Sequence, residues 1–161
     1  MRRHHPTALC SLIVTVALLV TACPSSSSFA RNLRIVLLAS GPLVESLHLS
    51  PALKSGVITD FTDMASNAAT LSDCLGASTD KSAKLICVQS FDTQVETIIA
   101  RGHFGQANSP RLQQVLGLIR GIIASARIYY GAPRIGAEAS QPVTEASIKA
   151  QVEALKKAMQ P

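Results

Sequence analysis

The stretch SPALKSGVITDFTDMASNAATLSDCLG, residues 50–76, carries the clearest helical pattern in the chain. Ser50 suits an N-cap, and Pro51 suits the first helical position, where the missing N–H is not needed. Apolar side chains then recur at steps of three and four, at Leu53, Val57, Phe61, Met64, Ala68, Leu71 and Leu75. The polar residues Asp60, Asp63, Asn67 and Asp73 fall largely on other sides. We therefore predict a long amphipathic helix that ends at Gly76, which suits a left-handed C-cap.

Four further segments show helical spacing, while alternation at period two never persists. They cover about residues 29–48, divided near Gly41 by Pro42, then 80–101, 109–130 and 144–161, with HFGQAN as a loop. Ser109 and Thr144 are expected N-caps. The sequence thus predicts an all-α fold: a small bundle of four main helices plus a shorter C-terminal helix, which either docks on the bundle or awaits a partner.

The composition indicates an aliphatic core whose helices approach closely. Aromatic residues make up 4% of the chain and Trp is absent, whereas 47% of the residues are hydrophobic. Gly117, Gly121 and Ser125 form a stripe of small residues at four-residue spacing. In a soluble bundle we expect such a stripe to mark a close helix crossing, and among lipids it would favour helix dimerisation.

The first residues have the layout of an export signal. Arg2 and Arg3 precede an apolar run from Ala8 to Val20. This run is shorter than the roughly 20 apolar residues that span a bilayer as a helix, and small residues follow it. The basic end would stay in the cytoplasm and the remaining chain would be exported.

The tetrapeptide Val20, Thr21, Ala22, Cys23 resembles the lipobox of bacterial lipoproteins, although most lipoboxes carry leucine where Val20 stands. The resemblance covers only the first 23 residues and implies that Cys23 becomes a lipidated first residue. Pro24 and the serine run 25–28 would then form a flexible tether. An ordinary cleaved signal, with Cys23 a bystander, is the alternative.

These features divide the chain into five parts. We expect a signal peptide at 1–22, a lipidated cysteine and serine-rich tether at 23–29, a helical bundle at 30–131, a linker at 132–143 and a C-terminal helix at 144–161. The predicted location is a bacterial membrane, facing the periplasm or the cell exterior. The formal net charge is +5, part of which leaves with the signal, and nothing in it calls for nucleic acid.

Cys74 and Cys87 are expected to form a disulfide. Thiols usually pair in the oxidising compartments that export reaches, and two antiparallel helices joined by a short loop would bring these cysteines together. The rival is a metal site with His48 and His103, but the spacing matches no zinc pattern. We therefore expect no metal, no cofactor and no catalytic residue.

A basic region is the one functional signal in the folded part. No acidic residue occurs between Glu96 and Glu138. Five arginines lie in this interval and are candidates for binding an anionic surface: Arg101, Arg111, Arg120, Arg127 and Arg134. The alternatives are a solvated helix face and a surface for anionic lipid, lipopolysaccharide or peptidoglycan.

The sequence favours a membrane-tethered binding or structural module, with an envelope protein as a further possible partner. A secreted, untethered effector or inhibitor and a small exported enzyme stay open as alternatives.

Overall fold

The computed structural model describes residues 28–133 and 142–161, and in these ranges it contains seven helices and no strand. Five are long: α1 (Ser28–Leu38), α3 (Pro51–Ala77), α4 (Lys81–Ile99), α6 (Pro110–Tyr129) and α7 (Glu145–Ala158). Two short helices, α2 (Gly41–Ser46) and α5 (His103–Ala107), lie in the connections. The prediction of an all-α bundle is confirmed.

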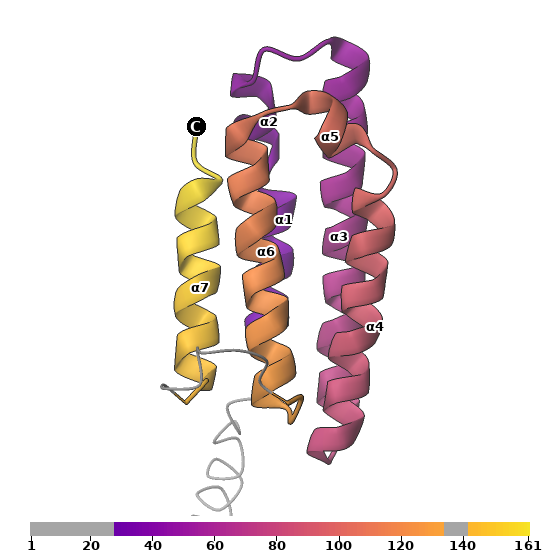
Figure 1. Ribbon diagram of the computed structural model, residues 1–161, viewed down its shortest axis with the longest axis vertical. Helices are drawn as coiled ribbons and strands as arrows, with labels where there is room; N and C mark the ends of the chain where they lie inside the picture. The colour runs from indigo at the N-terminus through magenta and orange to yellow at the C-terminus, as the bar shows by residue number, and fades with distance from the viewer. Residues whose placement is uncertain (1–27, 134–141) are drawn as a thin grey trace, which may run out of the picture.

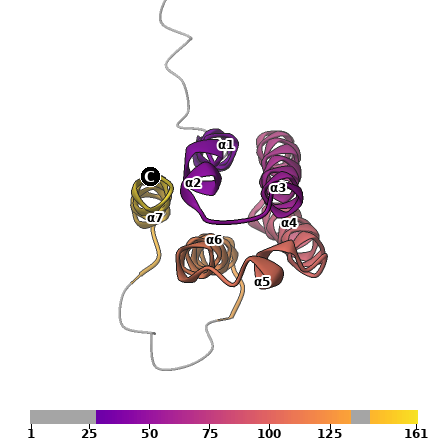
Figure 2. The same ribbon diagram turned by 90° about the horizontal axis from the view of Figure 1, so that it is seen from above.

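The five long helices form a closed ring, seen from above in Figure 2. α1 packs against α3, α3 against α4, α4 against α6, α6 against α7, and α7 returns to α1. α1 and α7 run in the same direction, whereas the other neighbours in the ring are antiparallel (Figure 1). Ser28 Oγ donates to Glu145 Oε1 at 3.1 Å, so the first turns of α1 and α7 lie side by side. α7 is therefore docked, which the sequence left open.

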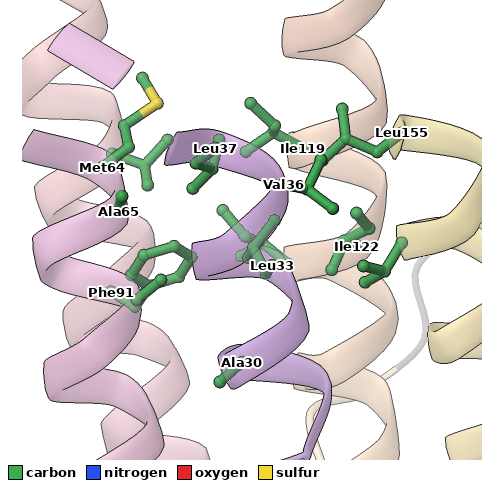
Figure 3. Packing of buried hydrophobic residues seen from close by; sticks show 14 of the residues in the cluster. Ala30, Leu33, Val36, Leu37, Met64, Ala65, Phe91, Ile119, Ile122 and Leu155 are labelled. Atoms are coloured by element: carbon green, nitrogen blue, oxygen red, sulfur yellow. The ribbon is translucent and has the colours of Figure 1, made fainter. Parts of the chain in front are cut away.

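The apolar residues that the periodicity placed inward form one core. In α3, Val57, Phe61, Met64, Ala68, Leu71 and Leu75 are all buried. The inward stripe of α7 is buried too, at Ile148, Val152 and Leu155, and it continues in Met159 at the C-cap. Figure 3 shows Leu33, Val36 and Leu37 of α1 among side chains of the neighbouring helices. Fixed aliphatic packing of this kind is the main source of stability for a bundle.

The predicted N-caps are confirmed. The hydroxyls of Ser50, Ser109 and Thr144 accept hydrogen bonds from backbone N–H groups in the first turns of α3, α6 and α7. Such a bond satisfies one of the donors that a helix start leaves without a partner. The expected division near Gly41 is also found, because α1 ends at Leu38 and α2 begins at Gly41.

Four local predictions about helix ends and helix contacts were wrong. α3 continues through Gly76 to Ala77 and its C-cap is the extended residue Ser78, so Gly76 is not a left-handed C-cap. α1 begins at Ser28 and buries Phe29, so the folded body starts before residue 30 and takes in the end of the expected tether. HFGQAN contains the short helix α5, not an open loop. Gly117 and Gly121 mark no close crossing, because a Cβ added at either would have no neighbour within 4 Å.

None of the described helices is both long and apolar enough to cross a membrane.

Candidate functional site

Arg120 and Arg127, two of the five candidate arginines, pair α6 with α4. Arg120 donates from Nε and Nη2 to the two carboxylate oxygens of Glu96, at 2.7 and 2.8 Å. Arg127 Nη1 lies 2.8 Å from Asp92 Oδ2. The hydrogen bonds from Arg120 hold the pKa of Glu96 below its usual range, and Glu96 in turn raises the pKa of Arg120. These arginines thus join two helices of the bundle.

A third candidate, Arg101, belongs to a cluster where α3 meets the connection between α4 and α5. Its Nη1 lies 3.3 Å from Asp60 Oδ1 and also pairs with Asp63. The hydrogen bond with Asp63 is the main cause that raises the pKa of Arg101. The other oxygen of Asp60 lies 2.9 Å from Nδ1 of His103. The Asp60 side chain is 0% exposed, so both partners serve a carboxylate that is removed from water.

The local backbone positions His103 for this contact. Gly102 has φ +91, a left-handed conformation that glycine adopts without steric cost, and it turns the chain into α5. Phe104 is buried and its ring meets Phe61 edge-on, with centroids 5.1 Å apart. The imidazole lies against Gly56, where an added Cβ would come within 2.8 Å of Cδ2. A glycine in α3 therefore leaves the space that the histidine ring fills.

The sequence analysis placed Asp60 among polar residues that lie largely off the apolar stripe, whereas its side chain is buried. Asp60 lies beside Leu53 and Leu71 when α3 is drawn at 3.6 residues per turn, so it belongs to the edge of the apolar stripe. That position was the available signal for a buried acid. Its partners could not be read from the pattern, since Arg101 and His103 lie about 40 residues further along the chain.

In chemical terms the cluster brings together two carboxylates, one imidazole and one guanidinium. An imidazole oriented by a carboxylate is a common arrangement for a general base, but such a base also needs a reacting group within hydrogen-bond reach. Here the imidazole is directed to Asp60, and the guanidinium is shared between Asp60 and Asp63. We interpret the cluster as the contact that fixes α5 on α3. Among the described residues no group of His, Cys, Asp or Glu is arranged to hold a metal ion.

The remaining candidates do not complete one basic surface. Arg111 is partly buried near the start of α6, and Arg134 lies outside the described residues. Arg101 contacts α3, whereas Arg120 and Arg127 contact α4. Binding of an anionic surface by these five arginines stays a prediction. The charges of Arg101, Arg120 and Arg127 are balanced by nearby carboxylates.

The pairing of Cys74 with Cys87 is confirmed at the level of geometry. The two sulfur atoms are at bonding distance, 1.98 Å, and link the end of α3 to the second turn of α4. Ser78, in the turn between these helices, donates from Oγ to the backbone oxygen of Cys74 at 2.8 Å. The bridge therefore fixes the α3–α4 hairpin. Cys23, the predicted lipidation site, lies outside the described residues.

A shallow groove of about 460 Å³ lies where α2 approaches α3. Glu45 and Lys54 form an ion pair at 2.9 Å along it, and Lys54 Nζ also donates to the backbone oxygen of Glu45. Ser55 and Thr59 contribute hydroxyls, and Ile58 contributes an apolar patch. The charged groups of this groove satisfy each other.

The outward face of α1 is different, because apolar and cationic side chains are exposed there together. Ile35 is 60% exposed and Leu38 is 53% exposed. Arg31 and Arg34 are exposed on the preceding turn, and neither forms an ion pair with a described carboxylate. α1 contains no acidic residue. On this face, exposed apolar side chains and cations without a described carboxylate partner thus occur together.

Comparison with protein-family models, with curated proteins and with solved structures finds no match to this chain.

Proposed function

We propose that this chain is a lipid-anchored module of a bacterial envelope, in which Cys23 holds a helical domain at a membrane for binding or structural interaction. The order of sequence features before the bundle carries the proposal. A short apolar export pattern is followed by Val20, Thr21, Ala22 and Cys23, and then by a serine run that leads into α1 at Ser28. Two or three acyl chains on one cysteine would suffice for stable anchoring.

The Cys74–Cys87 bridge supports export. Disulfides persist in periplasmic and extracellular proteins, whereas the reducing cytoplasm of most bacteria keeps thiols free. Cys87 is buried, and the bridge joins consecutive helices, which is the arrangement of a structural disulfide. A bridge in this position suits a small domain that works outside the cell's reducing interior.

The pairing of the acidic side chains supports a binding role over a catalytic one. Asp60, Asp92 and Glu96 each accept from an arginine, so their charges are engaged in holding helices together. The chemistry available for recognition lies on the surface of the bundle. Anionic lipid, lipopolysaccharide, peptidoglycan or another envelope protein are the partner classes that a tethered domain would meet.

Labelling of cells with radioactive palmitate tests the anchor. The wild-type chain and a Cys10→Ser variant should carry label and enter the detergent phase, because neither lacks the thiol that is lipidated. The Cys23→Ser variant should lose the label and stay in the aqueous phase. Cys10 is a matched control because it also lies in the N-terminal segment.

Mass spectrometry of residue 23 in protein purified from cells gives an independent readout. A Cys23 that carries diacylglycerol supports the proposal. Unlabelled protein recovered from the culture medium, with Cys23 unmodified or removed, would overturn it and favour the secreted, untethered effector.

A further inference from the structure

We infer that the outward face of α1, defined by Arg31, Arg34, Ile35 and Leu38, rests on an anionic phospholipid bilayer when the domain is anchored. The inference depends on the proposed lipid anchor and adds to it an orientation of the domain and a contact surface. Three observations carry it: the reach of the tether, the composition of this face and the state of its charges.

The tether is short compared with the bundle. Five peptide units separate Cys23 from Ser28, and even a fully extended chain of this length spans only about 17 Å. α3, with 27 residues, is about 40 Å long. α1 directly follows the tether, so its start is held closer to the lipid than the distant end of the bundle. The anchor thereby favours contacts made by the end of the bundle where α1, α4 and α7 begin, and the composition of the exposed faces decides among these helices.

The composition of the face suits the boundary between headgroups and acyl chains. Three large apolar side chains are strongly exposed in the described residues, and two of them, Ile35 and Leu38, lie on α1. Arg31, Ile35 and Leu38 follow one another at steps of four and three, which places them on one side of the helix. An interfacial helix combines such apolar residues with cations, and its apolar side enters the lipid by about 5–10 Å.

The charges of this face are available to a ligand. The guanidinium groups of Arg101, Arg120 and Arg127 are occupied by carboxylates elsewhere in the bundle. Those of Arg31 and Arg34 are exposed and have no carboxylate partner among the described residues. Phosphate oxygens of anionic headgroups match guanidinium in charge and in hydrogen-bond geometry.

Two shallow hollows extend the face toward α7. They have volumes of about 210 and 230 Å³ and share Val36, Ala39 and Lys156 in their linings. Lys156 is exposed at their margin and its Nζ lies 3.9 Å from Oε2 of Glu153, which lines the hollow beside Ile35. The long stem of a lysine can cover apolar surface while its charge stays at the level of the headgroups. The hollow beside Ile35 thus continues the mixed surface, and the charge of its acidic lining residue, Glu153, is opposed by Lys156.

A bilayer fits this face better than a second copy of the chain. Protein interfaces are depleted of charge at their centre, whereas a symmetric contact through α1 would bring in the arginines of both copies and no acidic residue of either helix. Anionic lipid instead supplies opposite charge for Arg31 and Arg34 and hydrocarbon for Ile35 and Leu38.

Tryptophan substitution tests the orientation, because the chain has no native Trp. Ile35→Trp and Ile86→Trp form a matched pair: the isoleucines are 60% and 64% exposed, on α1 and α4 respectively. Each full-chain variant is purified with its anchor and reconstituted into vesicles of phosphatidylcholine and phosphatidylglycerol, with or without bromine on the acyl chains. Flotation of the vesicles reports anchoring, and Trp emission reports contact with acyl chains.

In the floated protein, brominated lipid should lower the emission at position 35 by roughly twofold or more and leave position 86 nearly unchanged, since only the former would lie within the lipid. Replacing Arg31 and Arg34 by Gln should lower the ratio of anchored protein whose α1 face contacts lipid to anchored protein whose α1 face does not, as read from the bromine quenching at position 35. The expected decrease is about fivefold for each arginine lost. The same exchange at Lys81 and Lys84 of α4 should have little effect.

Floated protein with equal quenching at both positions, or with none at position 35, overturns this inference and leaves the lipid anchor intact. Blue-shifted emission at position 35 without bromine quenching would indicate a contact between copies and also overturns it. Wild-type protein that does not float overturns the proposed anchor and this inference together.

Discussion

Gly56→Ala should destabilise this protein, although alanine is the better helix former. In the interior of a helix the exchange alone favours folding by about 1 kcal/mol. The added Cβ would lie 2.8 Å from Cδ2 and 2.9 Å from Cγ of His103, which forces the imidazole to move. The ring is fixed by its 2.9 Å contact with the buried Asp60, so movement weakens that bond. Loss of a donor to a buried acceptor costs about 1–3 kcal/mol, which leaves a net loss of roughly 1 kcal/mol.

Urea unfolding followed by far-UV circular dichroism measures this change. Gly117→Ala and Gly121→Ala are matched controls in α6, because nothing lies within 4 Å of a Cβ at either position. Each should raise the free energy of unfolding by up to about 1 kcal/mol. In a His103→Ala background, Gly56→Ala should also become stabilising by a similar amount, since the ring that obstructs the methyl group is gone.

A gain in stability for Gly56→Ala in the otherwise unchanged chain would refute this reasoning. So would an equal effect of the exchange in the presence and absence of the imidazole, because the two positions would then be energetically independent.

His103→Ala should lower the free energy of unfolding by about 2–3 kcal/mol, because a buried carboxylate loses a donor. Asp63→Ala removes an exposed ion pair and should lower it by less than about 1 kcal/mol. Equal losses for the two variants in urea titrations would contradict this. Replacing Cys74 and Cys87 by Ala should lower the free energy of unfolding by about 3 kcal/mol, because the bridge closes a loop with a sequence separation of 13. A wild-type melting temperature that does not change when a reductant is added would argue against this contribution. The hydrogen bond from Arg120 lowers the pKa of Glu96, so the stabilisation by this ion pair is present at neutral pH and is lost as the pH falls through the lowered pKa. In the Glu96→Gln variant the melting temperature should therefore fall less steeply toward acid pH. Parallel curves of melting temperature against pH for the variant and the wild type would disagree with this expectation.

The helices and their inward faces could be predicted because they depend on local spacing. The apolar residues of α3 recur at the helical period, and Ser50 with Pro51 specifies where the helix begins. The same cap and proline recur at Ser109 and Pro110. The Cys74–Cys87 bridge could also be predicted, because it closes a short loop between consecutive helices.

The partners of the charged residues were harder to predict from the sequence, because these ion pairs join segments that are far apart in the chain. The run without acidic residues after Glu96 suggested a free basic face, yet Arg120 and Arg127 reach back to carboxylates of α4. A charge pattern read along one helix does not report charges on the helix beside it. The role of Gly56 could not be predicted for the same reason, because the His103 ring that requires a glycine there belongs to α5.

The return of α7 to α1 places a condition on the timing of folding. α1, the first of the described helices, packs against α7, the last of them, so the ring cannot close until α7 has been synthesised. For the proposed export, this means that the ring would still be open while the chain passes through a translocation channel.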